Sequence, residues 1–217
     1  MKELLTLLAL LPLLCGAQEL KSTGTSVDYI VPEGWWHTES VGDRNKDGVA
    51  DLALIALPND SAHIKVRDDG YAYNFNQPLL AIYFGTDGGR FRLWKTYDEV
   101  MPATVDEYTM IDYAINITPR GTMTIGIEAF MTMGSYGSPN VTYVFRFQDG
   151  DFYLIGEEQH SLSRMSGEDE TISYNYLTHK RQQVVSNAFD DSIKPREKWT
   201  TIPKGPLKRL GTWSLDY

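Results

Sequence analysis

Apolar residues in this chain tend to recur at every second position, and this alternation constrains the fold more than any other feature. Successive side chains of an extended strand point to opposite faces, so the pattern predicts strands that bury one face. The runs are short, rich in Val, Ile, Tyr, Phe and Thr, and bounded by Gly, Asp or Pro. The expected strands are Ala50–Leu57, Leu79–Phe84, Arg90–Thr96, Ile111–Ile117, Thr122–Phe130, Val141–Phe147, Phe152–Glu157, Ile172–Leu177 and Gln183–Asn187.

Turn sequences between these runs predict antiparallel hairpins. Asp87-Gly88-Gly89, Pro119-Arg120-Gly121 and Asp149-Gly150 supply residues that tolerate a positive φ. Only Asp98–Tyr108 is a candidate for a turn or two of helix, and Pro102 weakens that prediction. The fold class expected is therefore mainly β, a single domain of antiparallel hairpins arranged as propeller-like blades or as a β-sandwich.

Two of the expected hairpins resemble each other in sequence. Phe84–Leu93 and Phe147–Leu154 each carry an Asp-Gly turn followed by Phe and then Leu. Repeated blades are one interpretation of this likeness. The other is that Asp-Gly is simply common between β-strands.

The first residues, Met1–Ala17, read as a secretory signal peptide. A basic residue near the start precedes the apolar run Leu4–Leu14, and small residues follow it. The mature chain is then expected to begin at Gln18 and to be exported, to the periplasm or the cell exterior. Attachment as a lipoprotein through Cys15 is the less favoured alternative, because the residues before that cysteine match a lipobox poorly. No later apolar run approaches the roughly 20 residues of a membrane span.

Composition excludes several classes of function. Cys15 is the only cysteine, so residues 18–217 contain no thiol for a disulfide, a zinc site or a nucleophile. The net charge of −9 argues against a nucleic acid or an anionic membrane as the partner. The segment 190–217 is locally basic, and Pro195, Pro203 and Pro206 interrupt it. It is expected to be an irregular, solvated tail of the single domain formed by residues 18–217.

The nine residues Asp43–Asp51 have the spacing of a calcium-binding loop, DxNxDGxxD. Calcium binds six to eight oxygen atoms, and alternate residues of a tight loop present them while Gly48 permits the sharp turn. The two basic residues of the loop, Arg44 and Lys46, are expected to point outward. The predicted ligands are the side chains of Asp43, Asn45, Asp47 and Asp51 and the backbone carbonyl of Val49.

The loop differs from an EF-hand at its end. Position twelve is Leu54 rather than a bidentate glutamate, and a strand follows instead of a helix. The expected affinity is therefore weak, with a Kd on the order of 10⁻⁴ M, and the expected role is structural. The alternative is a turn rich in Asp and Asn that holds no ion.

These residues resemble an FG-GAP or VCBS-type unit. Val41–Leu54 supplies the loop and the strand after it, and Leu79–Phe91 supplies a strand that ends in Phe84-Gly85. The resemblance covers one unit, residues 42–93, and the chain has no second DxNxDGxxD loop. In that family such units carry calcium loops and build β-propeller blades of integrin α chains and secreted bacterial proteins. Other parts of the chain are similar to uncharacterised exported bacterial proteins.

Signatures of the common catalytic sites are absent from the sequence, which has no GxSxG, HExxH, P-loop or GxGxxG pattern. Glu157, Glu158 and His160 are a candidate acid and base group, although a solvated loop after a strand explains them more simply. Trp35 and Trp36 are a candidate platform for a sugar ring. Alternation is expected to send one of these two to the core and the other to the surface.

The leading hypothesis is a non-enzymatic binding or structural protein, exported, in which calcium stiffens one loop and other loops contact a protein or a glycan. The alternative is a hydrolase that acts on envelope or dietary glycans through carboxylates. An acidic cleft would favour the hydrolase. The sequence predicts no particular biological process.

Overall fold

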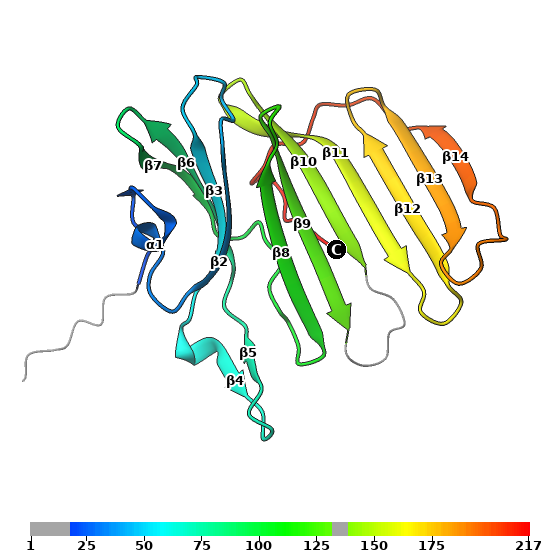
Figure 1. Ribbon diagram of the computed structural model, residues 1–217, viewed down its shortest axis with the longest axis horizontal. Coiled ribbons are helices and arrows are strands. Elements are labelled where there is room, and N and C mark those ends of the chain that lie inside the picture. Colours follow the sequence, from blue (N-terminus) through cyan, green and yellow to red (C-terminus); the bar gives the residue numbers. More distant parts are fainter. Residues whose placement is uncertain (1–17, 132–138) are drawn as a thin grey trace, which may run out of the picture.

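The computed structural model describes residues 18–131 and 139–217 of the chain (Figure 1). The expected signal peptide, Met1–Ala17 with Cys15, lies outside the described residues. Within the described ranges, no helix has both the length and the apolar character that crossing a bilayer demands. These residues form one mainly β domain of antiparallel strands, as the alternating pattern predicts.

The first half of the chain forms a five-stranded sheet in the spatial order β1-β7-β6-β3-β2. A separate two-stranded sheet, β4 with β5, extends from it in Figure 1. The elements are β1 (Thr23–Gly24), α1 (Val27–Ile30), β2 (Trp36–Gly42), β3 (Asp51–Leu57), η1 (Ser61–His63), β4 (Ile64–Val66), β5 (Ala72–Asn74), β6 (Leu79–Thr86) and β7 (Arg90–Tyr97).

The second half forms a seven-stranded antiparallel sheet, in which each strand pairs with the next along the chain. This sheet curves as a half-barrel, and its strands lie side by side from β8 to β14 in Figure 1. The Asp149-Gly150 turn has positive φ at both residues, 50° and 77°, as its sequence predicts. The strands are β8 (Thr109–Ile117), β9 (Thr122–Met131), β10 (Asn140–Gln148), β11 (Asp151–Leu162), β12 (Glu168–Asn175), β13 (Lys180–Asn187) and β14 (Arg196–Thr201).

The main hydrophobic core lies between the two sheets. Ile55 and Ile82 of the first sheet belong to the same buried cluster as Ile125 and Phe145 of the second. A smaller cluster covers the opposite face of the first sheet, where Ile30 packs with residues of β3 and β6. Strand β3 therefore has core on both faces, which explains why its sequence is continuously apolar rather than alternating.

Two expectations from the sequence are corrected, and one open alternative is decided. The nine predicted strands all occur, but Asp98–Tyr108 contains no helix and runs as bends and irregular chain. The segment 190–217 is not simply a solvated tail, because it includes β14 and carries two buried core residues, Leu210 and Leu215. Of the two open arrangements, the sheets pack face to face rather than as blades around an axis.

The two hairpins with similar sequences belong to different sheets and contact each other through aromatic rings. Phe84 of β6 lies 5.4 Å from Phe147 of β10, measured between ring centroids. Trp94 of β7 lies 5.8 Å from Phe152 of β11. Such edge-to-face pairs stabilise packed aromatic clusters. Phe84 and Phe147, which hold the same place in the two hairpins, thus lie on either side of the interface between the sheets, and Trp94, just beyond the first hairpin, adds a further ring.

Candidate functional site

The calcium-type loop joins β2 to β3 at one end of the domain. Gly42 pairs with Asp51 in the β2–β3 ladder, so the two ends of the loop are fixed side by side. The β8–β9 turn of the other sheet lies directly against the loop. A Cβ atom added to Gly121 of that turn would lie 3.2 Å from the carbonyl oxygen of Asp43. The loop is therefore placed at the junction of the two sheets.

Asp43 organises the first part of the loop. Its Oδ1 accepts a hydrogen bond from the backbone N–H of Lys46 at 2.6 Å, and its Oδ2 accepts one from Gly48 at 3.0 Å. Lys46 and Gly48 both have positive φ, 64° and 86°. The chain thus curls around the Asp43 carboxylate. Gly48 adopts the left-handed conformation, which glycine tolerates without steric cost.

Asn45 and Asp47 bond to each other and to the loop backbone. The Asn45 side-chain amide donates to Oδ2 of Asp47 at 2.8 Å, and the Asp47 N–H donates to Oδ1 of Asn45 at 3.1 Å. The N–H of Val49 donates to Oδ1 of Asp47 at 2.8 Å. Asp43, Asn45 and Asp47 are therefore held together within one turn of chain.

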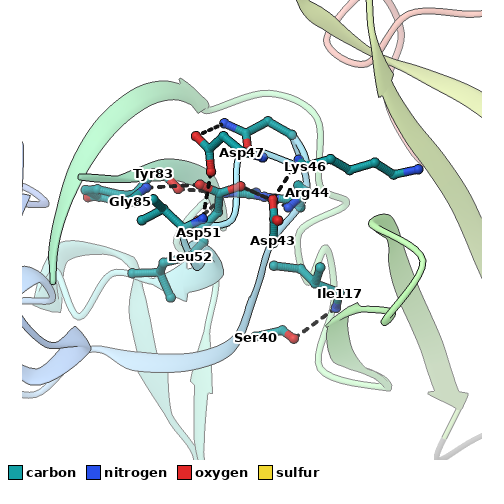
Figure 2. A network of polar contacts seen from close by, with 12 residues as sticks. Ser40, Asp43, Arg44, Lys46, Asp47, Asp51, Leu52, Tyr83, Gly85 and Ile117 are labelled. Carbon is teal, nitrogen blue, oxygen red and sulfur yellow. Dashed lines mark hydrogen bonds and ion pairs between the residues drawn. The ribbon is translucent and has the colours of Figure 1, made fainter. Parts of the chain in front are cut away.

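Asp51 occupies a different environment, because it is completely buried. Its Oδ2 accepts the backbone N–H of Arg44 at 3.0 Å and lies 3.7 Å from the guanidinium Nε of the same residue. Its Oδ1 accepts the backbone N–H of Gly85 in β6 at 3.0 Å. Figure 2 shows Asp51 between these two partners. Asp51 thus attaches the end of the loop to the neighbouring strand.

Arg44 is buried rather than outward, which corrects the expectation for this residue. Its Nη2 donates to the backbone carbonyls of Leu52 and Tyr83 at 2.9 and 2.7 Å (Figure 2). Burial lowers the pKa of Arg44 to about 10, although the adjacent Asp51 opposes that shift. The side chain therefore stays cationic at neutral pH and neutralises Asp51 inside the protein.

The guanidinium of Arg44 is packed against aromatic rings of both sheets. Its central carbon lies 5.7 Å from the ring centroids of Phe84 and of Phe152. Its Nε and Nη1 make no hydrogen bond to any described residue. Contact with the negative faces of aromatic rings compensates part of the cost of burying such a cation. Arg44 is consequently a link between the loop, β6 and the second sheet.

Gly85 must be a glycine in this arrangement. A Cβ atom there would lie 2.1 Å from the backbone carbonyl oxygen of Ala50 and 2.6 Å from the Val49 side chain. Both atoms belong to the end of the loop, so any side chain would push the loop away from β6. The glycine of the Phe84-Gly85 pair therefore has a physical role. Because it has no side chain, β6 approaches the loop closely enough for the Gly85 N–H to reach Asp51.

The predicted ligands are only partly assembled for a cation. Among the described residues, no group of three or more His, Cys, Asp or Glu side chains is placed to hold a metal ion. Asp43, Asn45 and Asp47 have the donor chemistry that calcium prefers, and each of their hydrogen-bonded oxygens keeps a second lone pair. Asp51 fits less well because its carboxylate already faces the Arg44 cation.

A concavity of about 1130 Å³ lies beside the loop. Asp43 and Lys46 line it from the loop, and the β8–β9 turn lines it with Arg120. Its floor is formed by residues of β10, β11 and β12, including Arg146 and Asn175. The loop is thus both a junction between the sheets and part of the wall of this concavity.

The two predicted tryptophans lie elsewhere. Trp35 packs against the smaller core cluster, and Trp36 is 45% exposed with its ring 6.1 Å from that of Tyr113. Trp36 begins β2, at the end of the strand opposite to the loop. The structure therefore separates Trp35 and Trp36 from the calcium-type loop and from the concavity.

The candidate acid and base group does not converge on one point. Glu157 accepts hydrogen bonds from the Tyr176 hydroxyl at 2.8 Å and from Gln159 at 2.6 Å. Glu158 accepts from Ser173 instead, at 3.0 Å, because successive residues of β11 point to opposite faces. The three residues named from the sequence are therefore divided between two faces of the sheet.

Comparison of the chain with protein-family models, curated proteins and solved structures finds no match. The resemblance to an FG-GAP or VCBS-type unit therefore rests on the residues quoted for it. What can be inferred about function rests on the geometry of the loop and of the concavity. Sequence reasoning missed the concavity, because its lining comes from segments far apart in the chain.

Proposed function

We propose that this is an exported, non-enzymatic binding protein in which calcium stiffens the loop Asp43–Asp51 beside a ligand-binding concavity. One observation carries the proposal. The loop contributes Asp43 and Lys46 to the wall of the concavity, while its last residue, Asp51, is anchored in the interior by Arg44 and Gly85. A cation in the loop would therefore stiffen one wall of the binding site and the junction of the sheets together.

Calcium would take oxygens from Asp43, Asn45 and Asp47 and from the backbone carbonyl of Val49, which are the ligand types of a hard cation. Asp51 is the fifth proposed ligand and the weakest, because the Arg44 cation beside it lowers its attraction for a second positive charge. The site has no bidentate glutamate, and we propose a Kd on the order of 10⁻⁴ M.

The charge balance of the loop supports a divalent cation. Asp43, Asp47 and Asp51 contribute three negative charges, while Arg44 and Lys46 contribute two positive ones, which leaves one unbalanced negative charge. The resemblance to FG-GAP and VCBS-type units and the signal-like first residues both support export. Exported proteins meet enough calcium to fill a site of this affinity.

Calorimetric titration of residues 18–217 with calcium tests the proposal directly. We expect one site per chain with a Kd on the order of 10⁻⁴ M. The Asp47→Ala variant should lose the binding heat, because it removes one of the proposed calcium ligands. This ligand, unlike Asp51, is not buried. As the matched control, Asp87→Ala removes an exposed aspartate from another Asp-Gly turn and should leave binding unchanged. An unaltered titration for Asp47→Ala would show that any calcium binds elsewhere.

A further inference from the structure

The outward face of the seven-stranded sheet carries many small and polar side chains, although Met110 and Phe130, which pair across β8 and β9, are exposed and apolar. One row of cross-strand neighbours runs across all seven strands, from Ala114 in β8 to Trp199 in β14. At Ala114 and Gly126 the side chains are small or absent, so little stands above the sheet in this part of the row. Hydroxyl, carboxylate and amide groups follow along the same row. The members between Ala114 and Trp199 are Gly126, Thr142, Glu158, Ser173 and Gln182.

One end of this face is cationic. Lys46, Arg120 and Arg146 line the concavity of about 1130 Å³, and Asp43 is the one acidic residue of its described lining. None of the three cations is in the ion pairs found among the described residues. In a chain with a net charge of −9, a concavity lined by unpaired cations is a local exception. Arginine side chains in such a place suit carboxylate, sulfate or phosphate groups.

The adjoining part of the face has an aromatic platform. A second depression of about 590 Å³ shares Tyr174 and Asn175 with the first and is also lined by Ser173, Gln182 and Trp199. Trp199 is 57% exposed. The carboxylate of Glu197 fixes the platform, because it accepts Nε1 of Trp199 at 2.5 Å and Nε2 of Gln182 at 2.7 Å.

From these observations we infer that the outward face of β10–β14, together with the adjoining β8–β9 turn, binds an acidic oligosaccharide. Arg120 and Arg146 would bind its acidic groups, Trp199 would stack on the apolar face of a sugar ring, and the amide of Asn175 would hydrogen-bond to hydroxyl groups between them. The inference rests on the proposed function as a binding protein and names its ligand class. A long nucleic acid fits less well, because the net charge of −9 repels a polyanion at a distance.

Binding assays with a panel of oligosaccharide tetramers test the inference. The panel contains uronate-bearing, sulfated and phosphorylated tetramers, their neutral counterparts, and inorganic polyphosphate as a probe with charge but no sugar. We expect at least one acidic tetramer to bind, and its neutral counterpart to bind at least tenfold more weakly. Arg146→Gln and Trp199→Ala should each weaken binding of that tetramer at least tenfold. Arg92→Gln, which removes an exposed arginine from β7 in the other sheet, should change it less than twofold.

Three results would overturn the inference. Equal binding of acidic and neutral tetramers would remove the role of the cations. If polyphosphate bound as tightly as the acidic tetramer, and Trp199→Ala left its binding unaffected, the site would recognise charge alone. No binding of any acidic tetramer at millimolar concentration would leave the face without this ligand class. Calcium titration of the same preparations separates the two proposals: a protein that binds calcium but no acidic tetramer overturns this inference alone.

Discussion

Replacement of Arg44 by methionine is expected to lower the free energy of unfolding by about 3–5 kcal/mol, the usual cost of removing one partner of a buried ion pair. The change leaves the Asp51 carboxylate buried without a counter-charge. It also removes the donor to the carbonyls of Leu52 and Tyr83. Methionine retains most of the packing volume, so the loss reports on charge and hydrogen bonding. Urea denaturation followed by circular dichroism measures it.

The double variant separates the cost of breaking the Arg44–Asp51 pair from the cost of losing either side chain by itself. Asp51→Ala alone should be costly as well, because it strands the Arg44 cation and the N–H of Gly85. The combined Arg44→Met and Asp51→Ala change should cost clearly less than the sum of the single changes. Arg92→Met, at an exposed position of β7, serves as the control and should stay within about 0.5 kcal/mol. A cost below about 1 kcal/mol for Arg44→Met would contradict the buried pair.

Alkaline pH is expected to destabilise the protein strongly, through tyrosines buried in the neutral form. Burial raises the pKa of Tyr83 and of Tyr143 to about 12, and it raises those of Tyr97 and Tyr113 further. Unfolded tyrosine ionises near pH 10. The unfolded state therefore loses protons first, so stability is fully present below pH 10 and falls as the pH rises toward 12. Each such tyrosine contributes roughly 1.4 kcal/mol per pH unit.

Denaturation at pH 8, 10 and 11 checks this pH dependence. Arg44 acts in the opposite direction, because its lowered pKa makes the folded state release that proton first. Several tyrosines outweigh this single group, so the free energy of unfolding should fall as the pH rises above 10. Tyr83→Phe should reduce the slope, at the cost of the hydrogen bond from the hydroxyl to the carbonyl of Lys21. Native protein whose 13 tyrosines all ionise at pH 10 by absorbance would refute the prediction.

Most strands were predictable because period-two alternation records burial of one face. The missed strands lack that signal. β2 has exposed or half-buried residues throughout, and β14 is a largely exposed edge strand with the charged sequence Arg-Glu-Lys. Leu210 and Leu215 could not be assigned to the core either, because they are isolated apolar residues in an irregular segment. Their burial depends on contacts with segments far away in the sequence, since the Leu210 N–H donates to the carbonyl of Phe152 and the Leu215 N–H to that of Val100.

The candidate site was predictable only where it is local. The spacing from Asp43 to Asp51 placed Asp43, Asn45 and Asp47 in one turn, because neighbouring residues determine such a loop. Burial of Arg44 depends on Phe84 and Phe152 from two other segments, and no local pattern reveals it.

The outward face was equally inaccessible from the sequence. Which residues share a cross-strand row depends on strand register, and the register shifts at Val144/Phe145 where β10 pairs with β11. A single shift of this kind changes which side chains of β11 lie beside those of β10. Nothing in the sequence therefore indicates that Trp199 and Arg146 lie on the same face.

The calcium dependence of the melting temperature tests the central claim most directly. A ligand that binds only the folded state raises its stability by about 2.7 kcal/mol when present at a hundredfold excess over Kd. Residues 18–217 should therefore melt several degrees higher in 10 mM calcium than in chelator. Asp47→Ala should abolish that rise, while Asp87→Ala keeps it. Equal melting temperatures in calcium and in chelator for the unaltered protein would contradict the account of the loop as a structural calcium site.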